Sequence, residues 1–140
     1  MTSSGFVALV VEDDALTRID LAMTFEGSGW TVLEAASGDS ALELCHSDAH
    51  VDALITDIDL GGGASGWDVA RAFWQRDVLP VVYTSASADS PPCHVPQSCF
   101  VAKPRPSSAL VTACLRLHER FRQKSGRDVD DSVIRAAGRA

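Results

Sequence analysis

The chain has 140 residues, of which 46% are hydrophobic and 22% charged, so it can bury one core and we expect one domain. Its 19 acidic and 12 basic side chains give a net charge of −7, which argues against a nucleic-acid partner because a phosphate backbone requires a positive surface. No apolar run approaches the ~20 residues of a membrane span. The four cysteines form no CxxC pair, so we expect a cytoplasmic protein with reduced thiols.

Apolar runs alternate with helical spacings along the chain. Residues 6–11 form a nearly unbroken apolar run that ends at three acids, and this predicts a strand followed by a helix. Leu16, Ile19 and Met23 then recur at helical spacing. Further strands are expected at residues 30–35, 51–60, 81–85 and 98–102, with helices that begin near residues 37, 66 and 107.

Two segments depart from this alternation. Prolines 91, 92 and 96 would break any helix longer than a turn or two between the fourth and fifth strands. From Gln123 onward the chain is polar, so residues 123–140 are expected to form a flexible tail. Val129, Val133 and Ile134 could form one further amphipathic turn within that tail.

Strands that alternate with helices indicate a parallel sheet with helices on both faces, and the loops that leave the strands then share one edge. Ligand chemistry in open parallel sheets gathers at that edge. The polar residues carried there are Glu12, Asp13 and Asp14 after the first strand, Asp57 and Asp59 from the third, Thr84 and Ser85 from the fourth, and Lys103 after the fifth.

Carboxylates gathered in one place repel one another unless some are protonated or a cation lies among them. Mg²⁺ suits oxygen ligands and typically binds one or two carboxylates together with a phosphate. Lys103 would add a mobile cation and the fourth strand a hydroxyl donor, so these groups could surround a phosphoryl group. The simplest chemistry is attack by Asp57 on phosphorus, which gives an aspartyl phosphate.

Five motifs resemble the receiver domains of two-component response regulators. They are VVEDD at 10–14, LITDI at 54–58, SGWD at 65–68, LPVVYTSA at 79–86 and FVAKP at 100–104. The resemblance covers roughly residues 5–122 and implies a stand-alone receiver domain over that range. It also implies a flavodoxin-like α/β fold, in which a doubly wound, five-stranded parallel sheet of order 2-1-3-4-5 carries helices on both faces.

The same resemblance implies roles for the acids at the sheet edge. Asp57 matches the phosphoacceptor of the family. Glu12 and Asp13 match its acidic pair, which holds Mg²⁺ together with Asp57. The carbonyl of Asp59 would complete the metal shell.

The hydroxyl, lysine and aromatic positions of the family are matched as well. Ser85, five residues after Pro80, matches the family's hydroxyl better than Thr84 does. Lys103 matches its lysine, and Phe100 falls where receivers carry a switch aromatic. The prolines described above occupy the place of the family's fourth helix, so the usual output face is expected to differ in shape.

These matches imply a phosphoacceptor switch rather than an enzyme. The donor would be a phosphohistidine on a sensor histidine kinase or a histidine phosphotransfer protein, and an unidentified protein would read the result. Phosphate loss would be slow self-catalysed hydrolysis, tuned by Asp59 and Ser87. Two alternatives stay open: a phosphate sink without an output role, and a receiver-shaped module that is never phosphorylated. Homodimer formation is also left open.

A small phosphatase of the haloacid-dehalogenase type is the rival from another class. Asp57 and Asp59 form a D-x-D at a strand end, with a hydroxyl strand and a lysine downstream. In that family, however, the nucleophile lies on the first core strand and further metal-binding acids follow the lysine. In this chain the acids precede Asp57, and no acid follows Lys103 until Glu119. This order favours the receiver.

Overall fold

A computed structural model describes residues 5–86, 95–103 and 106–135, with the side chains of the last helix described as far as residue 121. Five parallel strands form one sheet in the order β2-β1-β3-β4-β5. The strands are β1 (Val7–Val11), β2 (Thr31–Ala35), β3 (Ala53–Asp57), β4 (Val81–Ser85) and β5 (Cys99–Ala102). The helices are α1 (Ala15–Gly27), α2 (Gly38–His46), α3 (Gly66–Arg76) and α4 (Ser107–Arg135). The strand order confirms the flavodoxin-like fold expected from the sequence.

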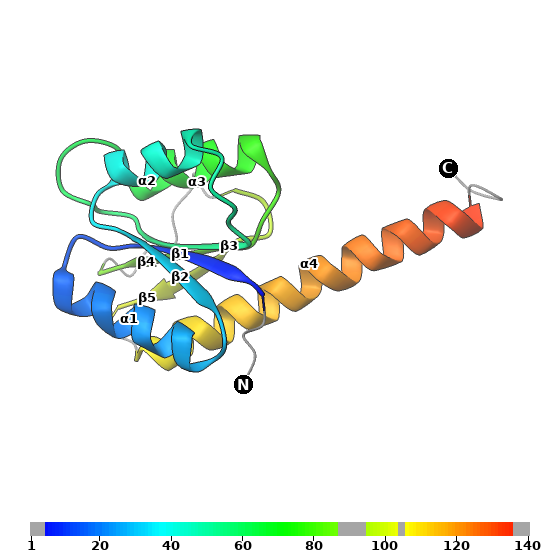
Figure 1. Cartoon of the computed structure of the whole chain (residues 1–140), viewed down its shortest axis with the longest axis horizontal. Helices are drawn as coiled ribbons and strands as arrows, with labels where there is room; N and C mark the ends of the chain where they lie inside the picture. Colours follow the sequence, from blue (N-terminus) through cyan, green and yellow to red (C-terminus); the bar gives the residue numbers. More distant parts are fainter. Residues whose placement is uncertain (1–4, 87–94, 104–105, 136–140) are drawn as a thin grey trace.

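The sheet lies between two layers of helices, with α2 and α3 on one face and α1 and α4 on the other (Figure 1). Successive side chains of a strand point to opposite faces. Leu9 and Val11 of β1 therefore belong to the core beneath α2 and α3, whereas Ala8 and Val10 belong to the core beneath α1 and α4. Because both faces are covered, the inner strands β1, β3 and β4 are buried along nearly their whole length.

Helix α1 forms where the sequence predicts it, but its orientation was not foreseen. The side chains whose spacing indicated the helix lie on its outer face: Leu16 is 79% exposed, Ile19 48% and Met23 65%. The core contacts come from Leu21 and Phe25, which are buried. The apolar stripe of α1, defined as Leu16, Ile19 and Met23, is therefore left at the surface.

Helix α4 is longer than the sequence suggested. Its apolar positions Leu110, Cys114 and Leu117 are buried as expected. The helix then continues through Arg135 and extends beyond the body of the domain, where a polar tail was expected from residue 123 (Figure 1). No proline follows residue 106, and one glycine in a helix interior costs only about 1 kcal/mol relative to alanine. Polarity alone therefore did not end the helix. The flexibility of residues 123–140 and the domain limits 5–122 stay predictions.

Two further expectations fall partly outside the described residues. The proline-rich segment expected to lack a long helix, together with Ser87, lies mostly within residues 87–94, which the structure does not describe. Among the described residues, Cys45, Cys99 and Cys114 form no disulfide, and the reduced state of the thiols stays a prediction.

Candidate functional site

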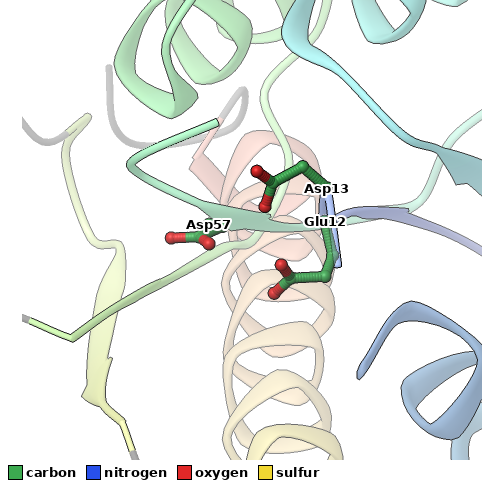
Figure 2. A group of neighbouring side chains, drawn as sticks. All are labelled: Glu12, Asp13 and Asp57. Atoms are coloured by element: carbon green, nitrogen blue, oxygen red, sulfur yellow. The ribbon is translucent and has the colours of Figure 1, made fainter. Parts of the chain in front are cut away.

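Three carboxylates meet at the carboxyl edge of the sheet. Glu12 and Asp13 follow β1, and Asp57 is the last residue of β3, which lies beside β1. One oxygen of each lies within 4.8 Å of the other two, and Figure 2 shows the three side chains next to one another. Glu12 and Asp57 are buried, whereas Asp13 is exposed. A partly buried cluster of oxygen ligands with one side open to solvent fits a hard cation that keeps some of its waters, such as Mg²⁺.

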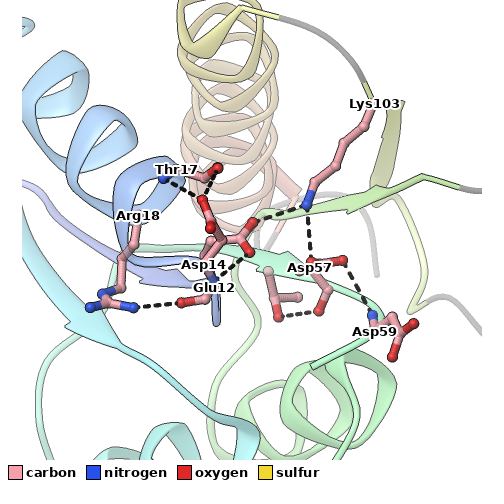
Figure 3. Close-up of polar contacts among 8 residues, drawn as sticks. Glu12, Asp14, Thr17, Arg18, Asp57, Asp59 and Lys103 are labelled. Carbon is pink, nitrogen blue, oxygen red and sulfur yellow. Dashed lines mark hydrogen bonds and ion pairs between the residues drawn. The ribbon is translucent and has the colours of Figure 1, made fainter. Parts of the chain in front are cut away.

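Lys103 follows β5 and reaches back across β4 to two of these carboxylates. Its Nζ donates to Oδ2 of Asp57 at 3.0 Å and to Oε1 of Glu12 at 3.1 Å (Figure 3). Its backbone N–H donates to the carbonyl of Ser85 at 2.8 Å, which joins the lysine to the end of β4. The structure therefore brings together Glu12, Asp57 and Lys103, three residues that the sequence assigned to one edge.

Burial and pairing act in opposite directions on the charges of this cluster. Burial raises the pKa of Glu12 above its usual 4.5, although hydrogen bonds from Asp14 and Lys103 lower it. Burial by itself would lower the pKa of Lys103, but hydrogen bonds to Asp57 and Glu12, and their charges, outweigh it and raise this pKa above 10.5. The lysine is thus held as an ammonium, while the charged form of Glu12 is disfavoured. A divalent cation would offset the remaining negative charge.

Backbone groups of the loop after β3 and of the start of α3 lie against Asp57. The backbone N–H of Asp59 donates to Oδ1 of Asp57 at 3.2 Å. The N–H of Gly66 donates to the carbonyl of Ile58 at 2.9 Å, and a Cβ at Gly66 would lie 2.2 Å from the carbonyl oxygen of Asp57. Only glycine lets the helix begin this close to the strand. The carboxylate of Asp59 is exposed and does not belong to the cluster, and the metal-binding role expected for its carbonyl stays a prediction.

The two hydroxyl residues at the end of β4 are both buried. Thr84 lies opposite Asp57 in the register of β3 and β4, and Ser85 follows it as the last residue of β4, opposite Ala102 of β5. Phe100 of β5 lies opposite Tyr83 of β4 and packs, half-buried, against the core beneath α2 and α3. The switch roles expected for Ser85 and Phe100 stay predictions.

Asp14 differs from its two acidic neighbours. Its side chain caps α1, since Oδ2 accepts from the backbone N–H of Thr17 at 2.9 Å and also from the Thr17 hydroxyl. These hydrogen bonds lower the pKa of Asp14 below its usual 3.8. Asp14 therefore caps the helix (Figure 3), whereas Glu12 and Asp13 belong to the carboxylate cluster (Figure 2).

Arg18 contacts the site but was not singled out from the sequence. Its Nη1 donates to the carbonyl oxygen of Glu12 at 2.9 Å, and its Nε donates to Oε1 of Glu34 at 3.3 Å. The only sequence signal is that Arg18 is the sole lysine or arginine among residues 1–70. A single cation in an acidic segment indicates pairing but does not name the partner.

A cavity of about 390 Å³ opens beside the cluster, between α1, β5 and the start of α4. The apolar part of its wall is formed by Leu16, Leu21, Val101 and Leu110, and its polar part includes Glu12, Thr84 and Lys103. The hydroxyl of Ser107 donates to the carboxylate of Asp20 and so joins α4 to α1 along the same wall. The cavity thus connects the apolar stripe of α1 with the candidate site.

The chain matches the response regulator receiver domain family over residues 8–113. The chain belongs to this family. The receiver is therefore a signalling domain of two-component systems, and the match decides against the haloacid-dehalogenase alternative. Over the part of the receiver that the structure describes, no helix combines the length and the hydropathy that crossing a membrane requires.

One solved structure and two regulators are similar to this receiver. A response regulator receiver protein from Sinorhizobium medicae WSM419 is 32% identical and superimposes with a TM-score of 0.78 over 83% of this receiver and 96% of that chain. The transcriptional regulatory protein AfsQ1 of Streptomyces coelicolor is 32% identical over 81 residues, 58% of this receiver and 35% of AfsQ1. The phyllosphere-induced regulator PhyR of Methylorubrum extorquens is 26% identical over 106 residues, 75% of this receiver and 36% of PhyR. The receiver thus spans about a third of the length of both regulators.

Proposed function

We propose that Asp57 accepts a phosphoryl group from a phosphohistidine on a sensor histidine kinase or a histidine phosphotransfer protein, with Mg²⁺ as cofactor. The phosphorylated receiver then signals by binding another protein in the cytoplasm. The observation that carries the proposal is the cluster of three carboxylates within 4.8 Å, with the ammonium of Lys103 3.0 Å from Asp57. Membership of the receiver family supports it.

The chemistry proposed for Asp57 is nucleophilic. A carboxylate oxygen attacks phosphorus, the new O–P bond forms as the P–N bond to the donor imidazole breaks, and the imidazole nitrogen takes up a proton. The N–H of Asp59 orients the carboxylate through Oδ1, and the ammonium of Lys103 stabilises charge on the transferred group. Glu12, Asp13 and Asp57, with the carbonyl of Asp59, would hold Mg²⁺, which when bound offsets charge on the phosphoryl oxygens.

The response to phosphorylation is proposed to run through β4 and β5. The hydroxyl of Ser85 and the ammonium of Lys103 would move toward the new phosphoryl group, and the hydrogen bond from the Lys103 N–H to the Ser85 carbonyl would make the two strands move together. Phe100 would carry this change into the core because it packs beside Tyr83. A partner then selects one form only through contacts that differ between the two.

The phosphodonor is proposed to dock on the apolar stripe of α1. Leu16 both belongs to this stripe and lines the cavity that reaches Glu12 and Lys103. A donor that presents its phosphohistidine to Asp57 must cover this side of the site, so an apolar face on the donor would bury the stripe. Burial of such side chains contributes about 25 cal/mol per Å² to binding before the costs of association.

The test of the acceptor is phosphorylation by a small donor. The receiver is incubated with acetyl phosphate and Mg²⁺, and its intact mass is measured. We expect the wild type to gain one phosphoryl group, and we expect no gain after chelation of Mg²⁺ or in Asp57→Asn. Asp59→Asn is the matched control because it removes a neighbouring exposed carboxylate and should still be modified. A modification that persists in Asp57→Asn would overturn the assignment.

A further inference from the structure

Arg18 connects α1 to two strands beside the acidic cluster. Its side chain is only 18% exposed, although it is the sole lysine or arginine among residues 1–70. One nitrogen donates to the main-chain carbonyl of Glu12 at 2.9 Å and another to the carboxylate of Glu34 in β2 at 3.3 Å. Figure 3 shows the guanidinium next to Glu12, with a dashed line for the bond to the Glu12 carbonyl.

Arg18 binds Glu12, and every polar group of Glu12, in the main chain and in the side chain, forms a hydrogen bond. Its N–H donates to the carbonyl of Ala35 at 3.1 Å, and its own carbonyl accepts from Arg18. Its two carboxylate oxygens accept from the N–H of Asp14 at 3.0 Å and from Lys103 at 3.1 Å. The peptide that joins Glu12 to Asp13 therefore has its oxygen bound by the guanidinium, and the orientation of this peptide decides where the Asp13 side chain starts.

Resting on the function proposed above, we infer that Arg18 is a positioning residue for the metal site. The bond from its Nη1 to the Glu12 carbonyl holds the peptide between Glu12 and Asp13 in the orientation that directs both carboxylates toward Asp57. The cation binds without reorganising this turn, so its affinity depends on a residue that does not touch it. Groups that orient metal ligands in this way typically change affinity by about 10–100-fold when removed.

An ordinary stabilising ion pair is the competing interpretation of the same contacts. The pair with Glu34 has a half-exposed carboxylate, and such pairs contribute about 0–1 kcal/mol to stability. That interpretation predicts a small change in the free energy of unfolding and no change in metal affinity. The two interpretations therefore differ in a measurement that needs no phosphodonor.

The experiment is a Mg²⁺ titration of the unphosphorylated receiver, followed by calorimetry, with urea unfolding of each variant beside it. We expect Arg18→Ala to weaken Mg²⁺ binding about tenfold. Arg18→Lys keeps the charge but lacks the planar fork that serves the carbonyl and Glu34 together, so it should fall between Arg18→Ala and the wild type. Glu34→Gln leaves the bond to the Glu12 carbonyl in place and should stay within about twofold of the wild type.

Each outcome decides the inference. Unchanged affinity in a folded Arg18→Ala protein overturns it, as does complete rescue by lysine, which would show that charge alone matters. A loss in Glu34→Gln equal to that in Arg18→Ala also overturns it. Should Arg18→Ala fail to fold, Arg18→Lys decides, and wild-type affinity in that variant counts against the inference. A wild-type receiver that binds no Mg²⁺ would instead contradict the proposed function, so the two failures are distinguishable.

Discussion

Lys103 and Asp57 form a direct ion pair, with Nζ 3.0 Å from Oδ2, although 46 positions separate them in the chain. The other oxygen of Asp57 accepts from the N–H of Asp59 at 3.2 Å, so both carboxylate oxygens have a partner before any phosphoryl group arrives. Phosphorylation would make one of these oxygens the bridging oxygen of an acyl phosphate and leave Lys103 to pair with the new phosphoryl oxygens. Lys103 thus pairs with Asp57 in the resting state and would pair with the phosphoryl group in the proposed product.

Lys103→Ala should destabilise the receiver in the absence of divalent cations. The change leaves the buried Glu12 and Asp57 carboxylates without their cation, while a third of the lysine side chain is exposed, so we expect a loss of about 1–2 kcal/mol in the free energy of unfolding. Urea unfolding measures it, and adding Mg²⁺ should restore part of the loss. Arg71→Ala is the control, because its exposed pair with Asp68 at 3.9 Å should contribute about 0–1 kcal/mol. If Lys103→Ala is as stable as the wild type, the ion pairs with Lys103 do not compensate the free-energy cost of burying the Glu12 and Asp57 carboxylates.

Glu12→Gln should make stability less dependent on pH. Because burial raises the pKa of Glu12 in the folded state, the folded protein binds its proton more tightly than the unfolded chain does. The resulting stabilisation is fully present below the unfolded value of 4.5 and is lost as pH rises through the folded value. Without metal, the advantage of Glu12→Gln over the wild type should therefore grow between about pH 4 and pH 7.

The measurement for Glu12 is urea unfolding of both proteins at several pH values with a chelator present. Glu26→Gln, an exposed glutamate on α1, is the matched control and should follow the wild type at each pH. A stability difference between Glu12→Gln and the wild type that does not vary with pH would show that burial does not raise the pKa of this carboxyl.

Ser65→Ala should cost about 1 kcal/mol of stability. Ser65 and Asp68 form a reciprocal cap at the start of α3, in which Oγ accepts from the Asp68 N–H at 3.3 Å and the Ser65 N–H donates to Oδ2 at 2.9 Å. The bonds that the Asp68 carboxylate accepts from the backbone N–H and the hydroxyl of Ser65 lower the pKa of Asp68 below 3.8, so the carboxylate's share of the cap should be lost as pH falls through the folded value. Ser108→Ala, at an exposed position of α4, should stay within about 0.5 kcal/mol. Equal effects of the two changes would argue against the cap.

Met23→Asp should slow phosphotransfer from a protein donor but not from the small donor acetyl phosphate. Met23 is 65% exposed on the apolar stripe of α1, so the change should alter stability by no more than about 0.5 kcal/mol. Transfer from a protein donor should slow by about tenfold if this side chain is buried at the interface, whereas transfer from acetyl phosphate should not change. Val78→Asp is the matched control, because Val78 is 57% exposed in the loop before β4, away from the stripe. A protein donor that transfers equally fast to wild type and Met23→Asp would place its contacts elsewhere.

The sequence by itself determined the sheet and the acids at its edge. Unbroken apolar strands that alternate with helices require parallel crossovers, and parallel strands end on a common side. Glu12 and Asp57 had to meet there because their strands are neighbours in the receiver order, and Lys103 ends a strand on the same side. The common edge follows from chain order and hydrophobic pattern, which are local properties of the sequence, whereas the neighbouring places of β1 and β3 were implied by the resemblance to receiver domains.

Only the tertiary structure decided which faces and which partners these elements use. Helical spacing predicted α1, yet it could not tell that the sheet covers Leu21 and Phe25 and leaves Leu16 in solvent. Polarity suggested a tail where α4 continues, because a helix needs backbone hydrogen bonds and tolerates polar side chains. The position of Arg18 as a single cation in an acidic segment did not name the Glu12 carbonyl as its partner. The rotation of a helix about its axis and the approach of a side chain to a distant main-chain oxygen depend on how whole elements pack, and no short stretch of sequence contains that information.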